Sequence, residues 1–553
     1  MTKSRTLIIG LDGATFDLID PMIEAGDLPA LSRLMNRGVR SPLQTWPNTN
    51  SAAAWSSMVT GYNSGEHGIF HFSGDLNLSD AGTGWSPVTA ASRRKDPFWR
   101  RLSAEGQSVG IINVPISYPA DSVNGFMIAG MDTPGIGSPG FAHPPELPDD
   151  LSASGIDYII DVPSLASVRR RDPARLPDSV RRMVDGRART ILHLMQSRQW
   201  DVLMAVFVAT DRVQHHFWPQ NLSEIDSSGW NPIRTLYRQI DDFFDKALAI
   251  AGEETNVLVV SDHGFGPTVP AKRCMNKLLA ATGLLRFRQG GGSTKGRALK
   301  TLLRTGRRIL PSTLQDQLAR SMPGLHLRAV NEDSHSTIDW SATQVFASHR
   351  GGRIWINLKG REPNGLVPES DYTALRDQVR DILLTATDAL TGKRIIRAVH
   401  NREDIYRGPY VEKVSDLIVD WDYDSIKDSL ICSFNGRSIT VTPDKSNPGN
   451  QWRGSHRPEG IFIASGPRIN HNAGVSDANI YDIAPTVLYL QGLAVPRDMD
   501  GKVITQMFNE DHISACPVQM CEPSNSDAQT TAGLSAEEAQ EMEKRLRDLG
   551  YIE

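Results

Sequence analysis

Short apolar runs recur along this 553-residue chain, and most of them are separated by stretches with helical periodicity. Runs that are apolar at every position suit parallel strands, because helices cover both faces of such a sheet. Helical patterns occupy 27–38, 94–105, 174–198 and 232–252. The apolar runs are TLIIG (6–10), SVGIINV (108–114), GFMIAG (125–130), DVLMAVFVAT (201–210), NVLVVS (256–261), DLIVDW (416–421) and GIFIASG (460–466). This alternation predicts an α/β fold, a doubly wound and mostly parallel sheet with helices on both faces.

Two segments depart from the alternation and suggest how the chain is divided. A Gly-rich stretch with many Arg and Lys residues occupies 286–328. It is typical of a solvated helical insertion, although it also suits a cap over an anionic substrate or a contact with a membrane surface. The polar residues 507–533 lack periodicity and indicate a linker. We expect a first part of the catalytic core at 1–285, a basic helical insertion at 286–345, the second part of the core at 346–506, and the linker with a C-terminal helix at 507–553.

The last twenty residues, LSAEEAQEMEKRLRDLGYIE, predict a helix that docks on the core. They begin with a Ser-x-x-Glu pattern, in which each side chain can accept a hydrogen bond from the other residue's backbone N–H. Met542, Leu546 and Leu549 fall on one face of the predicted helix. This face is the one that we expect to pack against the sheet domain.

The charge and the cysteines limit the possible partners and compartments. The formal net charge is -5, so the chain has no general basic field, and we expect no nucleic acid polymer as a partner. The N-terminal apolar run is too short for a signal sequence or a membrane span. The four cysteines form no Cys-x-x-Cys pair, which favours a reducing compartment. We therefore expect a cytoplasmic enzyme without a membrane span, and a homo-oligomer is compatible with the sequence.

Three of the apolar runs lead directly into an aspartate. Asp12 follows the first run, Asp211 follows the run at 201–210, and Asp262 follows the run at 256–261. The carboxyl ends of parallel strands meet at one edge of a sheet, so the three carboxylates are expected to converge there. Converging carboxylates repel one another unless cations lie between them.

Three histidines complete a set of candidate metal ligands. His215 lies four residues after Asp211, one helical turn onward, and His263 directly follows Asp262. His456 lies in a Gly-containing loop before the last apolar run. Each motif alone is more often a helix cap or a surface hydrogen bond. Taken together, the mixed Asp and His set favours Zn²⁺, with Mn²⁺ as the alternative, over Ca²⁺ or Mg²⁺, and indicates a hydrolase with two divalent ions.

Ser51 is the candidate nucleophile, and it has a second interpretation. It stands at the start of SAAAWSSMVT, where a serine side chain can cap a helix. A serine in this position can also be activated, because the positive end of the helix dipole and a nearby cation both favour its alkoxide. The local sequence is compatible with both roles.

The order and spacing of these motifs resemble the alkaline phosphatase superfamily, in particular its type I phosphodiesterase/nucleotide pyrophosphatase-like branch. The family's nucleophile stands nine positions before the Thr of a Thr-Gly pair, and that count from Thr60 leads to Ser51. The resemblance covers most of residues 5–505 through IIGLDGATFD, AAAWSSMVTGYNSGEHGIFHF, TDRVQHHFW, VVSDHGFG, INLKGREPNGLV, GSHRPEGIFIASGPRI and MDGKVI. It implies that Asp12, Ser51, Asp262 and His263 hold one metal ion, and that Asp211, His215 and His456 hold the other.

The resemblance implies a metal-dependent phosphoester hydrolase that acts on a small-molecule phosphoester through a phosphoserine intermediate, with diesters preferred over monoesters. The alternatives are a metal-dependent phosphomutase and a non-catalytic binding protein that retains the fold. Trp55 stands where the sulfatase and phosphonate-hydrolase branch carries Arg, which disfavours sulfate esters.

Several other residues have open roles. A role in organising a turn is favoured for His67, and the aromatic group His216, Phe217 and Trp218 suits either a pocket or the core. Arg350, Arg353 and Arg361 are candidate clamps for a substrate phosphate, although arginines in a Gly-rich turn are commonly surface residues.

Overall fold

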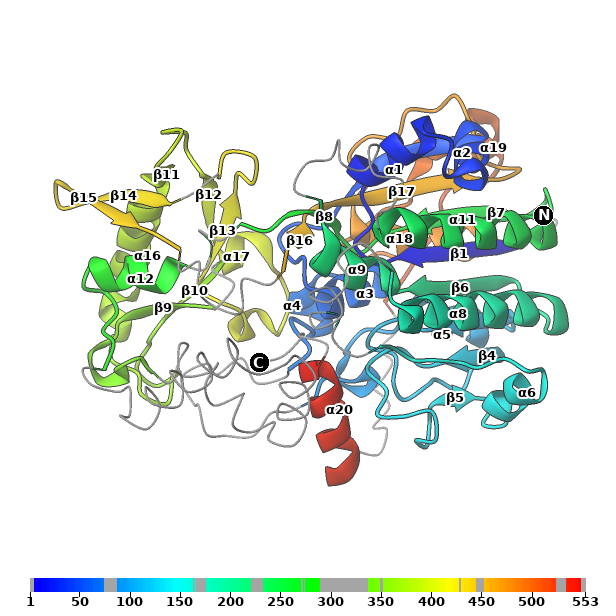
Figure 1. Cartoon of the computed structure of the whole chain (residues 1–553), viewed down its shortest axis with the longest axis horizontal. Coiled ribbons are helices and arrows are strands. Elements are labelled where there is room, and N and C mark those ends of the chain that lie inside the picture. Colours follow the sequence, from blue (N-terminus) through cyan, green and yellow to red (C-terminus); the bar gives the residue numbers. More distant parts are fainter. Residues whose placement is uncertain are drawn as a thin grey trace, which may run out of the picture.

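The computed structural model describes residues 4–73, 87–162, 165, 176–219, 232–269, 272, 274–288, 337–348, 352–426, 429–443, 452–523 and 534–548. Most of these residues belong to two lobes, a large one built on a central sheet and a smaller second lobe beside it (Figure 1). Among the described helices, none combines the length and the apolar character that crossing a bilayer requires.

Eight strands form the central sheet, in the order β2-β17-β7-β1-β6-β3-β4-β5. They are β1 (Thr6–Leu11), β2 (Gly38–Gln44), β3 (Val109–Ile112), β4 (Gly125–Ile128), β5 (Ala142–His143), β6 (Val202–Phe207), β7 (Asn256–Val260) and β17 (Glu459–Ser465). The five strands from β7 to β4 are parallel, which confirms the predicted mostly parallel sheet. The run at 460–466 differs, because β17 lies antiparallel to both of its neighbours. An unbroken apolar run shows that a strand is buried, but it does not give its direction.

Helices cover both faces of this sheet, as predicted (Figure 1). Successive side chains of β1 point to opposite faces, so Leu7 and Ile9 belong to one hydrophobic cluster and Ile8 to the other. The first cluster includes side chains of α1 (Phe16–Glu24), α2 (Pro29–Asn36), α6 (Leu147–Ala153), α8 (Asp178–Ser197), α9 (Ala209–Phe217) and α11 (Pro232–Ala251). The second includes side chains of α3 (Ser51–Thr60), α5 (Phe98–Ala104) and α18 (Ile483–Leu490).

Short elements complete this lobe. They are α4 (Ser64–His67), β8 (Gly264–Pro267), β16 (Gly454–Arg457), β18 (Val495–Pro496), and the 3-10 turns η1 (Ala90–Ser92), η7 (Ile480–Asp482) and η8 (Thr505–Met507). The antiparallel pair of β8 and β16 places His456 beside Phe265, so His456 lies in a strand and not in the expected loop. The segments around 264 and 456 therefore lie side by side, although almost two hundred residues separate them.

The second lobe has a hydrophobic core of its own, drawn from the described parts of 269–441. Its larger sheet has the order β12-β13-β10-β9 and its smaller sheet β11-β14-β15, with antiparallel pairs throughout. The run at 416–421 forms β13 in this sheet and is therefore not a parallel strand of the central sheet. The elements are α12 (Met275–Ala281), η4 (Trp340–Ala342), β9 (Val345–Ala347), β10 (Arg353–Ile356), α16 (Glu369–Leu384), β11 (Thr387–Asp388), β12 (Ile396–Asn401), α17 (Arg402–Ile405), η5 (Val411–Lys413), β13 (Leu417–Trp421), β14 (Leu430–Phe434) and β15 (Arg437–Val441). The greater part of the predicted insertion at 286–345 lies outside the described residues.

The C-terminal helix α20 (Ala536–Asp548) docks on the large lobe, as predicted. Met542 and Leu546 are fully buried in the second cluster of that lobe, whereas the predicted third residue of this face, Leu549, lies outside the described residues. The backbone N–H groups of Ser535 and Glu538 each donate to the other residue's side chain, which is the predicted capping box. The segment before it differs from the expected linker, because 507–523 contains α19 (Glu510–Ala515) and β19 (Met520–Cys521), and β19 pairs with β18.

Candidate functional site

Three aspartates meet at the carboxyl edge of the central sheet. Asp12 directly follows β1, Asp262 lies just beyond β7, and Asp211 lies in the first turn of α9, which follows β6. All three side chains are fully buried. The strands that carry them, β7, β1 and β6, are neighbours, so the predicted convergence follows from the sheet order.

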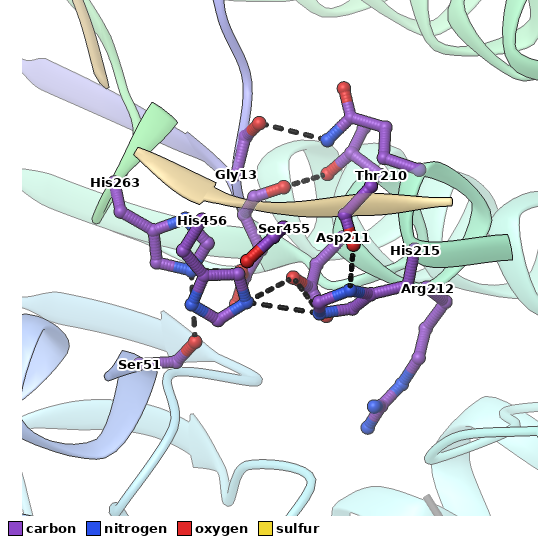
Figure 2. Close-up of polar contacts among 12 residues, drawn as sticks. Gly13, Ser51, Thr210, Asp211, Arg212, His215, His263, Ser455 and His456 are labelled. Carbon is purple, nitrogen blue, oxygen red and sulfur yellow. Dashed lines mark hydrogen bonds and ion pairs between the residues drawn. The ribbon is translucent and has the colours of Figure 1, made fainter. Parts of the chain in front are cut away.

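Ser51 lies at the same place, as the first residue of α3, and Figure 2 shows its side chain directed at His263. The distance between Ser51 Oγ and His263 Nε2 is 3.2 Å. The helix cap, however, is Asn50, whose side chain accepts a hydrogen bond from the N–H of Ala52. The prediction that Ser51 caps the helix is therefore wrong by one residue, and the Ser51 hydroxyl is not engaged in capping.

The three histidines share one arrangement. In each of them Nδ1 lies within hydrogen-bond distance of a backbone carbonyl, which can only accept, so Nδ1 carries the proton. The Nε2 atom of each ring then presents a lone pair, as a metal-ligating histidine does. The carbonyls belong to Gly454 for His215 (3.0 Å), Gly264 for His263 (2.9 Å) and Thr49 for His456 (2.6 Å).

These Nε2 atoms face the carboxylates in two groups. Asp211 Oδ1 lies 3.2 Å from Nε2 of His215 and 3.1 Å from Nε2 of His456, and the two Nε2 atoms are 3.0 Å apart (Figure 2). His263 Nε2 lies 3.6 Å from Asp12 and 3.4 Å from Asp262. Two lone pairs that face each other at 3.0 Å repel, unless a cation lies between them.

Without a cation, the buried carboxylates of the site lack sufficient positive charge nearby. Burial, together with the charges of the neighbouring aspartates, holds the pKa of Asp12 well above its usual range. Burial also raises the pKa of Asp262 to about 7, with Asp211 as the next cause. Burial lowers the pKa of His456 to about 3, which keeps the ring neutral and able to act as a ligand.

The donor set fits divalent metal ions. Oδ1 of Asp12 and Oδ2 of Asp262 are buried and accept no hydrogen bond from the described part of the chain. Ligand atoms of Asp12, Asp262 and His263 lie within 4.8 Å of one another, and so do those of Asp211, His263 and His456. Buried oxygen atoms without donors, beside histidine nitrogens that carry lone pairs, are what cations with Asp and His ligands require.

Two aromatic residues that support this site were not assigned to it from the sequence. Trp55 donates its indole N–H to Asp12 Oδ2 at 3.1 Å. The signal was its spacing, because Trp55 lies four residues after Ser51 and so on the same face of α3. The ring of Trp452 packs against that of His215, with their centroids 3.8 Å apart. No sequence pattern links these two residues, since β16 brings them together only in the fold.

The structure also places the residues whose roles were open. His67 is fully buried, where its Nδ1 accepts from the N–H of Ile69 and its Nε2 lies 2.9 Å from Ser57 Oγ, so it organises the turn as predicted. The aromatic group after His215 is buried, and Phe217 and Trp218 belong to the core of the large lobe. Arg350 lies outside the described residues. Arg361 forms a bidentate ion pair with Asp416 and is not a phosphate clamp.

Comparison with solved structures returns enzymes of phosphoester and phosphonate chemistry at low sequence identity. Phosphonoacetate hydrolase from Sinorhizobium meliloti 1021, in complex with phosphonoformate, is 13% identical with a TM-score of 0.49, and the match covers 88% of this chain and 95% of that one. Human ectonucleotide pyrophosphatase/phosphodiesterase 5 is 12% identical with a TM-score of 0.49, and the match covers 92% and 100% of the two chains. An inactive murine form of that protein in complex with AMP has 12% identity, a TM-score of 0.46, and coverage of 89% and 96%.

No protein of curated function matches the sequence. The family model for type I phosphodiesterase / nucleotide pyrophosphatase matches residues 6–429, which is more than half of the chain. The matched residues include Ser51 and every candidate ligand except His456. The chain therefore belongs to the type I phosphodiesterase/nucleotide pyrophosphatase family of the alkaline phosphatase superfamily, and it is a phosphoester hydrolase.

Proposed function

We propose that this enzyme is a phosphodiesterase that uses Ser51 as its nucleophile at a site for two divalent metal ions. The observation that carries the proposal is the common orientation of His215, His263 and His456, whose Nε2 lone pairs face Ser51 and the buried carboxylates. Six buried side chains from three strand ends and β16 would have no reason to meet in this arrangement in a purely structural core.

The ligand assignment is the one that the family resemblance implies, and the distances between the side chains support it. Asp12, Asp262, His263 and Ser51 would hold one ion, and Asp211, His215 and His456 the other. Zn²⁺ is our first choice and Mn²⁺ the second, given the mixture of nitrogen and carboxylate ligands. When bound, such ions supply positive charge that lowers the pKa of a nucleophilic hydroxyl and neutralises charge that develops on the phosphoryl oxygens.

Ser51 would attack the phosphorus atom in line with the leaving alcohol, forming a phosphoserine that water then hydrolyses. The position of Ser51 at the N-terminus of the ten-residue helix α3 suits both the alkoxide and the phosphoryl group, because the positive end of the helix dipole faces them. Asn50 caps the helix, so the Ser51 hydroxyl can turn towards the substrate. The carbonyls bonded to the histidine Nδ1 atoms fix the rings, so the ligand atoms need little reorganisation.

The site would accept small phosphoesters, and we propose cytoplasm as the compartment. None of the four cysteines, which all lie in the described part of the chain, forms a disulfide, and Cys274 and Cys432 are buried, which supports a reducing environment. A phosphomutase remains the second candidate, because a phosphoserine can pass its phosphoryl group to a substrate hydroxyl as well as to water. Hydrolysis in ¹⁸O-labelled water separates the two, since only a hydrolase places the label in the phosphomonoester that the diester releases.

The test compares bis-p-nitrophenyl phosphate with p-nitrophenyl phosphate, using protein stripped with a chelator and then loaded with Zn²⁺ or Mn²⁺. We expect metal-dependent cleavage that is faster for the diester. In the Ser51→Ala variant we expect kcat to fall by more than about 10³-fold, because the covalent step loses its nucleophile. Normal turnover by this variant would remove Ser51 from the mechanism, and a faster monoester would replace the diesterase assignment.

A further inference from the structure

Arg353 reaches from the second lobe to the segment that carries the nucleophile. It is the first residue of β10, and its Nη2 donates to Asn48 Oδ1 at 2.9 Å and to the hydroxyl of Tyr406 at 3.3 Å. The amide of Asn48 is fixed in turn, because its Nδ2 donates to Ser64 Oγ at 2.9 Å. The guanidinium is therefore held at a defined place, by neutral groups.

The charge of Arg353 has no counterion among the described residues. Its Nη1 is buried and has no hydrogen-bond acceptor there. Neighbouring arginines of the second lobe differ, since each of them pairs with a carboxylate: Arg361 with Asp416, Arg402 with Glu412, and Arg407 with Asp500. A buried cationic donor without an acceptor costs free energy, and an anionic ligand at this place would remove that cost.

The contact with Asn48 shows how Arg353 lies relative to the proposed nucleophile, Ser51. Asn48 precedes Ser51 by three residues, so their Cα atoms are at most about 11 Å apart. Between them, the carbonyl of Thr49 holds the ring of His456. The guanidinium thus contacts the short segment that leads from Asn48 to Ser51.

We propose that Arg353 binds a second anionic group of the substrate, so that this enzyme prefers phosphodiesters whose alcohol carries a further phosphate or carboxylate. The inference rests on the proposed function, since it requires Ser51 to mark the position of the scissile phosphorus. The planar fork of a guanidinium can donate two parallel hydrogen bonds to either group. Arg353 is the specificity-determining residue in this scheme, and it does not touch the reacting atoms.

The test uses three p-nitrophenyl alkyl phosphates of equal length, whose alkyl chains end in a hydroxyl, a carboxylate or a phosphate. With the metal-loaded wild-type enzyme, we expect kcat/KM to be roughly 10- to 100-fold higher for an anionic tail than for the hydroxyl tail, as one charge-assisted contact implies. Arg353→Gln should remove this preference and Arg353→Lys should restore part of it. The ratio between the carboxylate and the phosphate tail tells which group the site takes.

Arg407→Gln is the matched control, because it removes another arginine of the second lobe, and this one is already paired with Asp500. It should leave the preference unchanged. Calorimetry supplies a readout without turnover: in the Ser51→Ala background, Arg353→Gln should weaken binding of the preferred ester by a similar factor. Equal losses for all three esters would mean that Arg353 only holds the lobes together and would overturn the inference. Equal wild-type rates for the three esters would also overturn it while leaving the proposed function intact, whereas no cleavage of any of them with metal bound would overturn both.

Discussion

Buried carboxylates occur in both lobes, and they differ in whether the chain supplies positively charged partners for them. In the second lobe, Asp416 is fully buried and accepts from Arg361 at 2.6 and 2.7 Å, from the hydroxyl of Tyr372 and from the N–H of Ile356. In the large lobe, Asp12 and Asp262 are equally buried, but among the described residues only His263 offers a group that can carry positive charge within 4 Å of these carboxylates. A carboxylate that the chain neutralises itself has a structural role, whereas carboxylates left without compensation are available to cations.

The largest expected effect comes from removing a proposed ligand. Asp211→Ala should lower the metal content by one ion per chain and reduce kcat/KM by more than about 100-fold, because a direct ligand contributes more than the residues that orient it. Plasma emission spectrometry of the purified variant, together with the diester assay, measures both. A full complement of two ions would remove Asp211 from the ligand set.

Removing the buried carboxylate of the second lobe should reduce stability and leave the metal content unchanged. Asp416 also lies 3.4 Å from Nη1 of Arg402, so Asp416→Asn deprives both Arg361 and Arg402 of a buried carboxylate, and we expect a loss of about 3–5 kcal/mol in the free energy of unfolding. The metal content should stay at two ions per chain. Urea denaturation and metal analysis of the same preparation distinguish the two lobes, and a loss of metal in this variant would contradict the division of roles.

A pH series tests the charge of the catalytic site without metal. The pKa of Asp262 is about 7 in the folded chain, mainly because of burial, and a free aspartate titrates near pH 4. The raised value means that ionisation costs stability, and this cost develops as the pH rises from about 4 through 7. Asp262→Asn removes the ionisation, and its side-chain carbonyl can still accept from the N–H of Gly13.

In the presence of a chelator, the melting temperature of Asp262→Asn should therefore rise relative to the wild type between pH 5 and pH 8. With metal added, the wild type should regain the advantage, because cations compensate its carboxylates. Differential scanning calorimetry at four pH values measures the difference. A difference that does not change with pH would mean that Asp262 is compensated by the chain itself.

The smallest effect is expected at the residue that orients Asp12. Trp55→Phe removes the indole N–H donated to Asp12 Oδ2 but keeps a large aromatic side chain in the core. We expect about a tenfold loss in metal affinity or activity, as is usual for residues that hold a ligand in place. Titration of the stripped protein with Zn²⁺ measures the affinity. An unchanged affinity would limit Trp55 to a packing role.

The sequence alone shows whether each of these buried aspartates comes before or after a predicted strand. Asp12, Asp211 and Asp262 follow apolar runs, whereas Asp416 precedes one. The sequence therefore placed the first three at the carboxyl edge of a sheet, where the structure brings them together. The structure also brings Ser51 to this edge, 3.2 Å from His263 Nε2, although the helix cap is Asn50 and not Ser51.

Other features depend on partners that are distant in the chain. Three arginines near one Gly-rich turn looked alike in the sequence, yet Arg361 pairs with Asp416 and Arg353 with Asn48, which lies 305 residues away. The run at 416–421 looked like any buried strand, but its neighbours in space place it in the antiparallel sheet of the second lobe. No local pattern contains this information.

The sequence by itself determined the α/β class, the docked C-terminal helix and the residues that can supply metal ligands and a nucleophile. It could do so because buried strands, helix faces and strand ends leave signals within a few residues. Only the tertiary structure decided which ring nitrogens of His215, His263 and His456 face the carboxylates, and which buried charges find a partner. Those choices depend on backbone carbonyls and side chains hundreds of residues apart, which folding alone brings within hydrogen-bond distance.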